Sequence, residues 1–285
     1  MNMNRMRDWR EFGLRQREAV DIDPLYPVLR EVFQPLPAEE KLWSVLVYVA
    51  YYNLPSAMTA LSDTPPFTVP DGALSRLPTG IERRGLRGGE PLVRHLNSVL
   101  GFADYFGGFD SFLQHGWTGA PLRDWMWTRY NAEQVWGNGR WASYKLAEIL
   151  QKVLDWPIFP PNMGMDRASG PRQCIDMLWD DHVDAPECES RGRTLRIYAR
   201  EGGLYVDLAE VETVLCDFGS AMKGRYYPGH DVALLHDDIR RMPDGDPRLR
   251  LEASAVSALP ERYWRPIEPA LKRLYRDTGE IWRGP

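Results

Sequence analysis

Residues 212–231 hold the densest group of reactive side chains in the chain. The apolar spacing over residues 207–218 predicts a helix, on which Glu212, Cys216 and Ser220 would share one face because helical neighbours lie four residues apart. This face would present a carboxylate and a thiol, which can accept a proton and attack an electrophile. A plain core thiol is the alternative for Cys216. The predicted catalytic residues of this segment are Glu212, Cys216, Asp217 and Lys223.

The loop that follows, residues 224–231, adds a cation, two aromatic rings, a histidine and an aspartate. Aromatic rings stack on unpaired bases, and arginine binds phosphate oxygens through its planar guanidinium. Packing inside the protein is the alternative for the two adjacent tyrosines. The predicted substrate-binding residues of this loop are Arg225, Tyr226, Tyr227, His230 and Asp231.

A second candidate group lies in residues 163–172, where a carboxylate and two guanidiniums surround a glycine-containing turn that leads into a helix. Arg167 and Arg172 could bind a phosphate or pyrophosphate group, since the start of a helix also exposes backbone amides. The alternative is a loop with solvated arginines. Asp166 is a candidate catalytic carboxylate, with a helix cap or an ion pair as its alternative.

The turn at residues 137–145 reads Gly-Asn-Gly-Arg-Trp-Ala-Ser-Tyr-Lys and opens a helical pattern that continues to about residue 154. Unpaired amides and the positive end of the helix dipole coincide at such a helix start, which favours an anion. The alternative is a turn with a purely structural role. The predicted contacts to a DNA backbone phosphate are Gly137, Gly139, Arg140, Trp141 and Lys145.

Helices are the main elements that would position these residues. Residues 62–90 are rich in Pro, Gly and Arg and predict a long surface excursion, either a DNA-contacting flap or a solvated loop. A β-hairpin is predicted at 194–207, around Gly202 and Gly203. The fold class is therefore mainly α with a small β-hairpin, in a single domain over 1–285 that has a helical lead-in at 1–36 and a helical extension at 240–285. Helical spacing marks residues 1–37, 37–52, 91–106, 109–115, 120–136, 171–180, 207–218 and 260–277.

Composition limits the surroundings in which the chain works. Its formal net charge is −5, so a polyanion must be bound by a local basic patch. The three cysteines form no even disulfide framework and fit a reducing compartment. We find no signal-peptide pattern and no apolar stretch long enough for a bilayer, which predicts a cytoplasmic protein without a membrane partner. Cys174, His182, Cys188 and Cys216 lack a zinc-site spacing, so no metal site is predicted, while a role for a divalent metal stays open.

One part of the chain resembles the helix-hairpin-helix region of DNA glycosylases, closest to the alkylpurine branch. It consists of residues 136–145, the predicted helix that follows, and the sequence Trp156-Pro-Ile-Phe-Pro-Pro-Asn162. The resemblance implies a glycosylase-like fold whose hairpin amides hold a DNA phosphate beside a flipped-out nucleotide. A glycosylase carries its catalytic aspartate just after the Phe-Pro pair. Here that place reads Pro161-Asn162-Met163, so either Asp166 fills the role or base excision has been lost.

Three segments in order, residues 48–61, 137–172 and 212–227, look like the glycosylase-related proteins of phage thymine hypermodification. These are the amino acid:DNA transferases and the glutamyl/putrescinyl-thymine pyrophosphorylases. The resemblance implies a substrate in double-stranded DNA, a pyrophosphorylated 5-hydroxymethyluracil, and a location in the host cytoplasm. It also implies an amino acid co-substrate, with glycine as the expected donor, whose amine displaces pyrophosphate.

Under this hypothesis the candidate residues divide by role. Arg167, Arg172, Lys223 and Arg225 would neutralise pyrophosphate, and Glu212, Asp217 or Asp166 would accept the proton of the amine. Cys216 could add transiently to C6 of the pyrimidine, while Tyr226 and Tyr227 stack on the extruded base. The alternatives are a base-excising glycosylase that uses Asp166 and a non-catalytic DNA-binding module.

Overall fold

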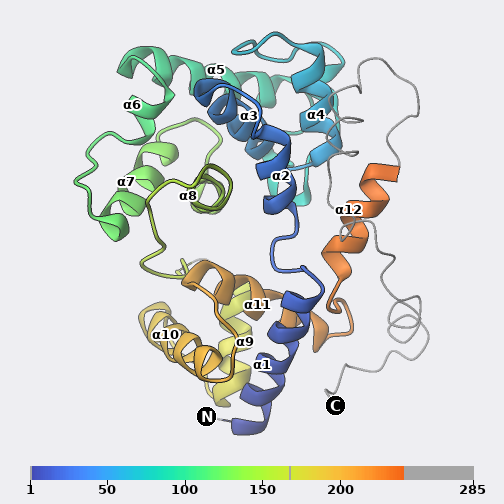
Figure 1. The fold of residues 1–285 in the computed structure, drawn as a ribbon, viewed down its shortest axis with the longest axis vertical. Coiled ribbons are helices and arrows are strands. Elements are labelled where there is room, and N and C mark those ends of the chain that lie inside the picture. Colours follow the sequence, from blue (N-terminus) through green and yellow to red (C-terminus); the bar gives the residue numbers. More distant parts are fainter. Residues whose placement is uncertain (1, 167, 241–285) are drawn as a thin grey trace. The chain divides into compact units, whose positions relative to one another are not determined.

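Helices make up all the regular structure of residues 2–166 and 168–240, the part of the chain that this computed structural model describes (Figure 1). The mainly α prediction is confirmed for these residues. The chain divides into two compact units. Unit 1 contains residues 2–25 and 160–236, and unit 2 contains residues 26–159. The single domain over 1–285 stays a prediction, and the predicted extension at 240–285, with its helix at 260–277, lies outside the described residues apart from Arg240.

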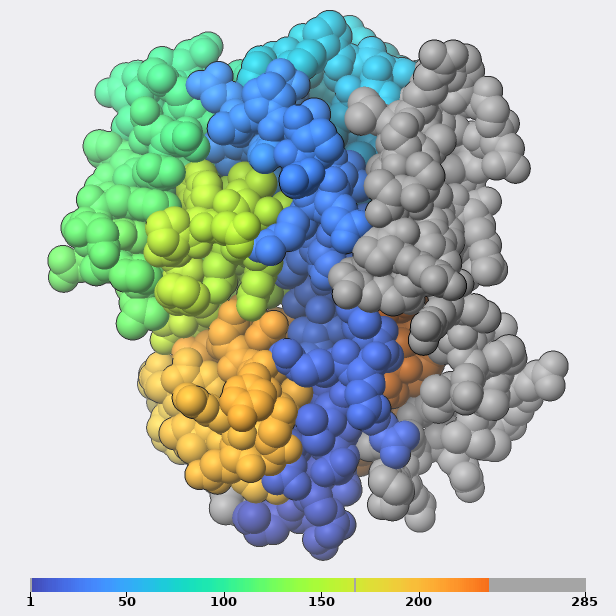
Figure 2. All heavy atoms as spheres, in the orientation of Figure 1, coloured from blue at the N-terminus to red at the C-terminus, as the bar shows by residue number. Residues whose placement is uncertain are grey.

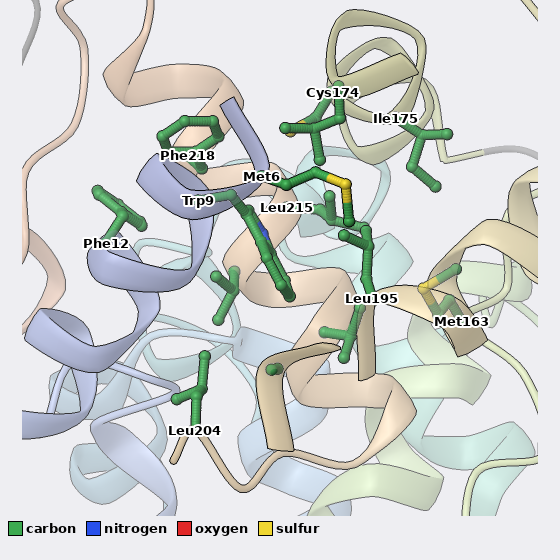
Figure 3. Close-up of a cluster of buried hydrophobic side chains, with 14 of the residues drawn as sticks. Met6, Trp9, Phe12, Met163, Cys174, Ile175, Leu195, Leu204, Leu215 and Phe218 are labelled. Carbon is green, nitrogen blue, oxygen red and sulfur yellow. The ribbon is translucent and has the colours of Figure 1, made fainter. Parts of the chain in front are cut away.

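Unit 1 is built from α1 (Met3–Glu18), α9 (Ser169–Trp179), α10 (Ala185–Glu201) and α11 (Leu208–Ala221), and α12 (His230–Arg240) begins in it. Met6, Trp9 and Phe12 recur every three residues on α1 and are buried, so this face of the helix enters the core (Figure 3). Phe12 meets Phe218 of α11 with ring centroids 5.5 Å apart. The core of unit 1 therefore depends on the N-terminal helix.

The predicted β-hairpin at 194–207 is wrong, because α10 continues to Glu201 and no strand forms there. Leu195 and Ala199 are both fully buried and four residues apart, which fits a helix packed on one side. Gly203 has φ +86° and ends the helix. Its amide donates to the Arg200 carbonyl at 3.1 Å, and the Leu204 amide donates to the Ala199 carbonyl at 2.9 Å. The two glycines thus form a helix C-cap where we expected a hairpin turn.

Unit 2 surrounds α3 (Ala38–Tyr51), in which every residue from 42 to 51 is buried. Such burial on all sides requires helices around it. In the space-filling view, the region of α6 and α7 forms an outer edge of this unit (Figure 2). The surrounding elements are α2 (Leu25–Phe33), α4 (Leu54–Asp63), η1 (Leu74–Arg76), η2 (Ile81–Leu86), α5 (Glu90–Phe106), α6 (Phe109–Leu113), α7 (Pro121–Glu133) and α8 (Arg140–Leu154).

Within the described residues, no helix combines the length and the apolar character needed to cross a membrane.

Candidate active-site and DNA-binding residues

The predicted phosphate-binding turn lies in unit 2, between α7 and α8. Gly137 has φ +87°, and a β-carbon at this position would lie 3.0 Å from Leu86 Cδ2 and 3.2 Å from His95 Nδ1. Both the backbone conformation and the lack of space therefore require glycine here. The turn therefore packs directly on residues of η2 and α5.

Two buried residues that the sequence analysis did not single out, Arg83 and His95, form hydrogen bonds with this turn. The Arg83 guanidinium donates to the Gly137 carbonyl at 3.2 Å and to Asn138 Oδ1 at 3.3 Å. His95 Nδ1 donates to the Trp136 carbonyl at 2.7 Å. Burial lowers the pKa of Arg83 to about 10, which leaves the guanidinium charged at neutral pH. Burial and the charge of Arg83 lower the pKa of His95 to about 3, so the imidazole is neutral.

Arg83 also shows what part of the 62–90 excursion does. This segment forms the two short helices η1 and η2, and Arg83 and Leu86 of η2 are buried. Arg76, Arg84 and Arg87 are exposed. One of its arginines thus supports the turn from inside the protein, while a DNA-contacting role for the exposed ones stays a prediction.

No side chain caps the start of α8. Its N-cap, Gly139, has no side chain to cap the helix, and its first turn contains no acidic residue. By contrast, Asn53 caps α4 and Asp184 caps α10 through their side chains. Arg140 is the first residue of α8 and is half-buried. Backbone amides and a guanidinium are therefore the groups present at this helix end.

The other two residues predicted at this turn point to structural roles. Trp141 packs edge-to-face on Tyr52, with ring centroids 4.7 Å apart. Lys145 is buried, and its ammonium lies 2.8 Å from the carboxylate of Glu148, which is fully buried. An ion pair inside the protein explains Lys145 better than a contact to DNA, because the ammonium would have to leave a buried partner.

In unit 1, α11 begins with a capping box, in which Asp207 and Glu210 each bond the other's backbone amide. The predicted helix at 207–218 is confirmed, so Glu212 and Cys216 share a face, and both are half-buried. A β-carbon at Gly170 would lie 3.5 Å from Cys216 Sγ. The exposed Lys223 donates to Gln173 Oε1 at 3.0 Å. The structure thus brings the 163–172 and 212–231 segments together.

The 163–166 loop is fixed by a carboxylate that the sequence did not single out. Glu189 of α10 accepts hydrogen bonds from the amides of Met163 at 2.8 Å and Met165 at 2.7 Å. The next residue, Asp166, is exposed. The Arg172 guanidinium donates to the Val183 carbonyl at 3.3 Å. Arg167 lies outside the described residues.

Asp217 lies in a group of acidic side chains. Gln16 Nε2 donates to its carboxylate at 2.8 Å. Burial raises the pKa of Asp217 well above its usual value, and the nearby charges of Asp231, Asp21 and Asp23 raise it further. A carboxyl group with a raised pKa is a better proton acceptor than an ordinary one once it has ionised. No three His, Cys, Asp or Glu side chains in the described residues are arranged to hold a metal ion.

Asp21 organises the loop after α11, and no sequence pattern pointed to it. Its carboxylate is fully buried. It accepts hydrogen bonds from Tyr226 Oη at 2.9 Å and from the amides of Gly229 at 2.7 Å and of Asp231 and Val232 at 3.0 Å each. Burial, together with the charge of Asp231, raises the pKa of Asp21 to about 7. Asp21 therefore ties the predicted substrate-binding loop to the end of α1.

The remaining residues of this loop differ in exposure. Tyr226 is buried, with ring centroids 6.2 Å from Phe12 and 4.8 Å from His230. Tyr227 is also largely buried and meets His230 at 5.3 Å. Stacking on a base would require these rings to leave their present packing. Arg225 is exposed, and His230 Nδ1 lies 3.0 Å from the Asp231 carboxylate.

The fold and these groups define a helical protein in which no side chain caps the start of α8 and in which Asp217 lies among other acidic side chains. Residues 79–227 match the family model described as amino acid:DNA transferase, and because this is more than half of the chain, the protein belongs to that family. It is accordingly a transferase that acts on DNA with an amino acid. The resemblance to the amino acid:DNA transferases is confirmed. The match includes the 137–145 turn and most of the 212–231 segment, whereas Asp21, His230 and Asp231 lie outside it.

Proposed function

We propose that this transferase displaces pyrophosphate from 5-pyrophosphoryloxymethyl-deoxyuridine in double-stranded DNA with the amine of an amino acid, glycine being the proposed donor. The product is a hypermodified thymidine. The observation that carries the proposal is the acidic group around Asp217, which gives a member of this family a proton acceptor for an incoming amine. A glycosylase-like helix-hairpin-helix fold is part of the same proposal, supported by the short turn between α7 and α8.

The first step is binding of the DNA and extrusion of the modified base. Atoms of a base inside a duplex are out of reach, and flipping costs about a few kcal/mol. We propose that the open start of α8, with Gly137, Gly139 and Arg140, holds one backbone phosphate. Arg83 and His95 keep the turn in the shape that this contact needs.

The second step is displacement at the exocyclic methylene. The amine nitrogen forms a bond to this carbon, the carbon–oxygen bond breaks, and pyrophosphate leaves with the electron pair. Lys223 and Arg225 are exposed and close in sequence to the acidic group, which suits them to neutralise the leaving group. Arg167 and Arg172 remain further proposed contacts to the pyrophosphate.

The proton of the amine must also be removed. Asp217 is our preferred acceptor because its pKa is raised, with Glu212 and Asp166 as the other carboxylates proposed for this role. Cys216 is half-buried, and transient addition of its thiolate to C6 of the ring is proposed as an assisting step. His230 and Asp231 are proposed to contact the substrate beside Tyr226 and Tyr227.

The test is to incubate DNA that contains 5-pyrophosphoryloxymethyluracil with the protein and a mixture of amino acids, and to analyse the nucleosides by mass spectrometry. We expect a new nucleoside with the mass of a joined amino acid, together with released pyrophosphate. Abasic sites in place of this product would support the glycosylase alternative, in which Asp166 is the catalytic residue. DNA binding without any new nucleoside or abasic site would support a non-catalytic module.

A further inference from the structure

A chain of hydrogen bonds inside unit 1 connects Asp217 of α11 to residues at the end of α1. Gln16 lies in the last turn of α1 and is fully buried, whereas Asp217 is half-buried. Gln16 Nε2 donates to Asp217 Oδ2 at 2.8 Å and to Tyr226 Oη at 3.5 Å. Tyr226 Oη in turn donates to Asp21 Oδ2 at 2.9 Å. Asp217 is therefore the most exposed member of this chain, and the other three support it from the interior.

The donors and acceptors of this chain fix the orientation of the Gln16 amide. Asp21 accepts from three backbone amides and takes the Tyr226 hydroxyl as its fourth donor. Once its proton is directed at Asp21, the Tyr226 oxygen can only accept, so the NH2 group of Gln16 must face it. The same NH2 group donates to Asp217. Turning the amide over would bring its oxygen against two acceptors, which is unfavourable.

The surroundings of Asp217 give this contact its importance. Burial raises the pKa of Asp217, and so do the charges of Asp231 at the start of α12 and of Asp21 and Asp23 after α1. The hydrogen bond from Gln16 acts in the opposite direction and lowers this pKa. Gln16 is uncharged, so it stabilises the carboxylate without neutralising it. Since Gln16 engages Oδ2, Oδ1 is the oxygen left to accept a proton.

We propose that Gln16 is a positioning residue, which holds the Asp217 carboxylate in one orientation and is itself kept in place by the Tyr226 hydroxyl. Asp21 completes the support as the acceptor of that hydroxyl. The inference rests on the proposed function, in which Asp217 accepts the proton of the amine. Gln16 and Asp21 both lie outside residues 79–227, the part that matches the family model, so the N-terminal helix and the segment after it contribute to the site.

The test compares Gln16→Met with the unchanged full chain, because methionine has a similar length and cannot donate. Single-turnover transfer of glycine to DNA that contains 5-pyrophosphoryloxymethyluracil is measured at a series of pH values. The variant should be about tenfold slower at neutral pH, and its rate should rise about one pH unit later, which is the effect of one hydrogen bond to a charged group. Its affinity for DNA should not change. Gln34→Met, the same substitution at an exposed glutamine of unit 2, is the control and should keep the original pH profile.

Two further variants distinguish positioning from a purely structural role. On the background of Asp217→Asn, Gln16→Met should cause no additional loss of rate, because Gln16 acts through Asp217. Tyr226→Phe keeps the ring and removes the hydroxyl, so its rate should also rise at a higher pH while the KM for DNA stays the same. Circular dichroism shows whether each variant keeps the fold, and Tyr226→Phe decides the question if Gln16→Met unfolds.

Two results would overturn the inference although the unchanged chain is active. They are one pH profile shared by Gln16→Met and the unchanged chain, and an equal loss from Gln16→Met with and without Asp217→Asn. Lack of transfer by the unchanged chain would instead refute the proposed function, and the role of Gln16 with it. The activity of the unchanged chain therefore distinguishes the two failures.

Discussion

Asp217 is the residue on which the proposed chemistry depends most. Removing its charge while keeping its shape, with Asp217→Asn, should lower the rate of amino acid transfer by about 10²- to 10⁴-fold, the usual contribution of a general base. DNA affinity should change little, because the proposed phosphate contact lies in unit 2. In the unchanged protein the rate should rise with pH as the carboxyl group ionises, and it should do so at a higher pH than for an ordinary aspartate because burial raises the pKa.

Single-turnover kinetics at several pH values measures this effect. Glu201→Gln is a suitable control, since Glu201 is an exposed carboxylate at the end of α10 and has no place in the proposed reaction. Full activity of Asp217→Asn would remove Asp217 as the base and leave Glu212 and Asp166.

Asp21 should make stability depend on pH. Its pKa is about 7 in the folded protein, whereas an aspartate in an unfolded chain titrates near 4. Between these values the folded chain keeps a proton that the unfolded chain has lost, so raising the pH favours unfolding. The free energy of unfolding should fall between about pH 4 and pH 7, by up to about 4 kcal/mol from this group, and then level off. The pKa of Asp217 is also raised in the folded protein, so its contribution to the free energy of unfolding has the same sign.

Urea unfolding at a series of pH values tests this expectation, with Asp21→Asn as the variant that removes the titrating group. The variant should show a weaker pH dependence than the unchanged protein. Asp155→Asn, the same substitution at an exposed position, serves as the control. If Asp21→Asn and the unchanged protein share one pH profile, Asp21 has an ordinary pKa.

Sequence reasoning singled out the candidate residues of 212–231 but not the residues that contact and position them. Asp21 lies between two helices, within the segment 1–37 that was predicted to be helical, and becomes important only because the loop after α11 folds back onto it. Arg83 was one of several arginines in the 62–90 excursion. Arg83 differs from its exposed neighbours only because η2 packs against the Gly137 turn, which buries its guanidinium.

At the scale of elements, the turn before α8 should depend on support from inside unit 2. Arg83→Met removes the guanidinium that bonds Gly137 and Asn138, so it should destabilise the protein by about 1–3 kcal/mol and weaken DNA binding although Arg83 is only 4% exposed. Arg84→Met makes the same substitution at an exposed neighbouring residue and should leave the free energy of unfolding unchanged. Thermal unfolding and fluorescence anisotropy with labelled DNA measure the two effects. Equal loss of DNA affinity in both variants would mean that Arg83 acts through its charge alone.

Most helices could be predicted because their apolar residues follow a clear period. The expected helices at 91–106, 109–115 and 171–180 correspond to α5, α6 and α9. The error at 194–207 arose from two adjacent glycines, which end a helix as readily as they turn a hairpin. Only the burial of Leu195 and Ala199 decides between the two, and burial is a property of the folded chain.

At the scale of the whole molecule, the net charge of −5 opposes binding to DNA. Affinity should therefore come from a few local contacts and fall steeply with salt. Arg140→Ala should reduce the slope of log K against log salt by about one if its guanidinium meets a phosphate. The exposed Arg123 of α7 provides the control in Arg123→Ala. Anisotropy titrations over a range of KCl concentrations give the slopes, and an unchanged slope in Arg140→Ala would exclude the contact.

The division of the chain also sets an order of events during synthesis. Residues 26–159 of unit 2 are continuous, so this unit can begin to fold while the rest of the chain is still being made. Unit 1 joins residues 2–25 to residues 160–236, and the buried side chains of α1, among them Trp9 and Phe12, pack against α9 and α11. Because α1 is synthesised before α9 and α11, its apolar face stays uncovered until these helices emerge from the ribosome. This interval is when the nascent chain has most need of a chaperone.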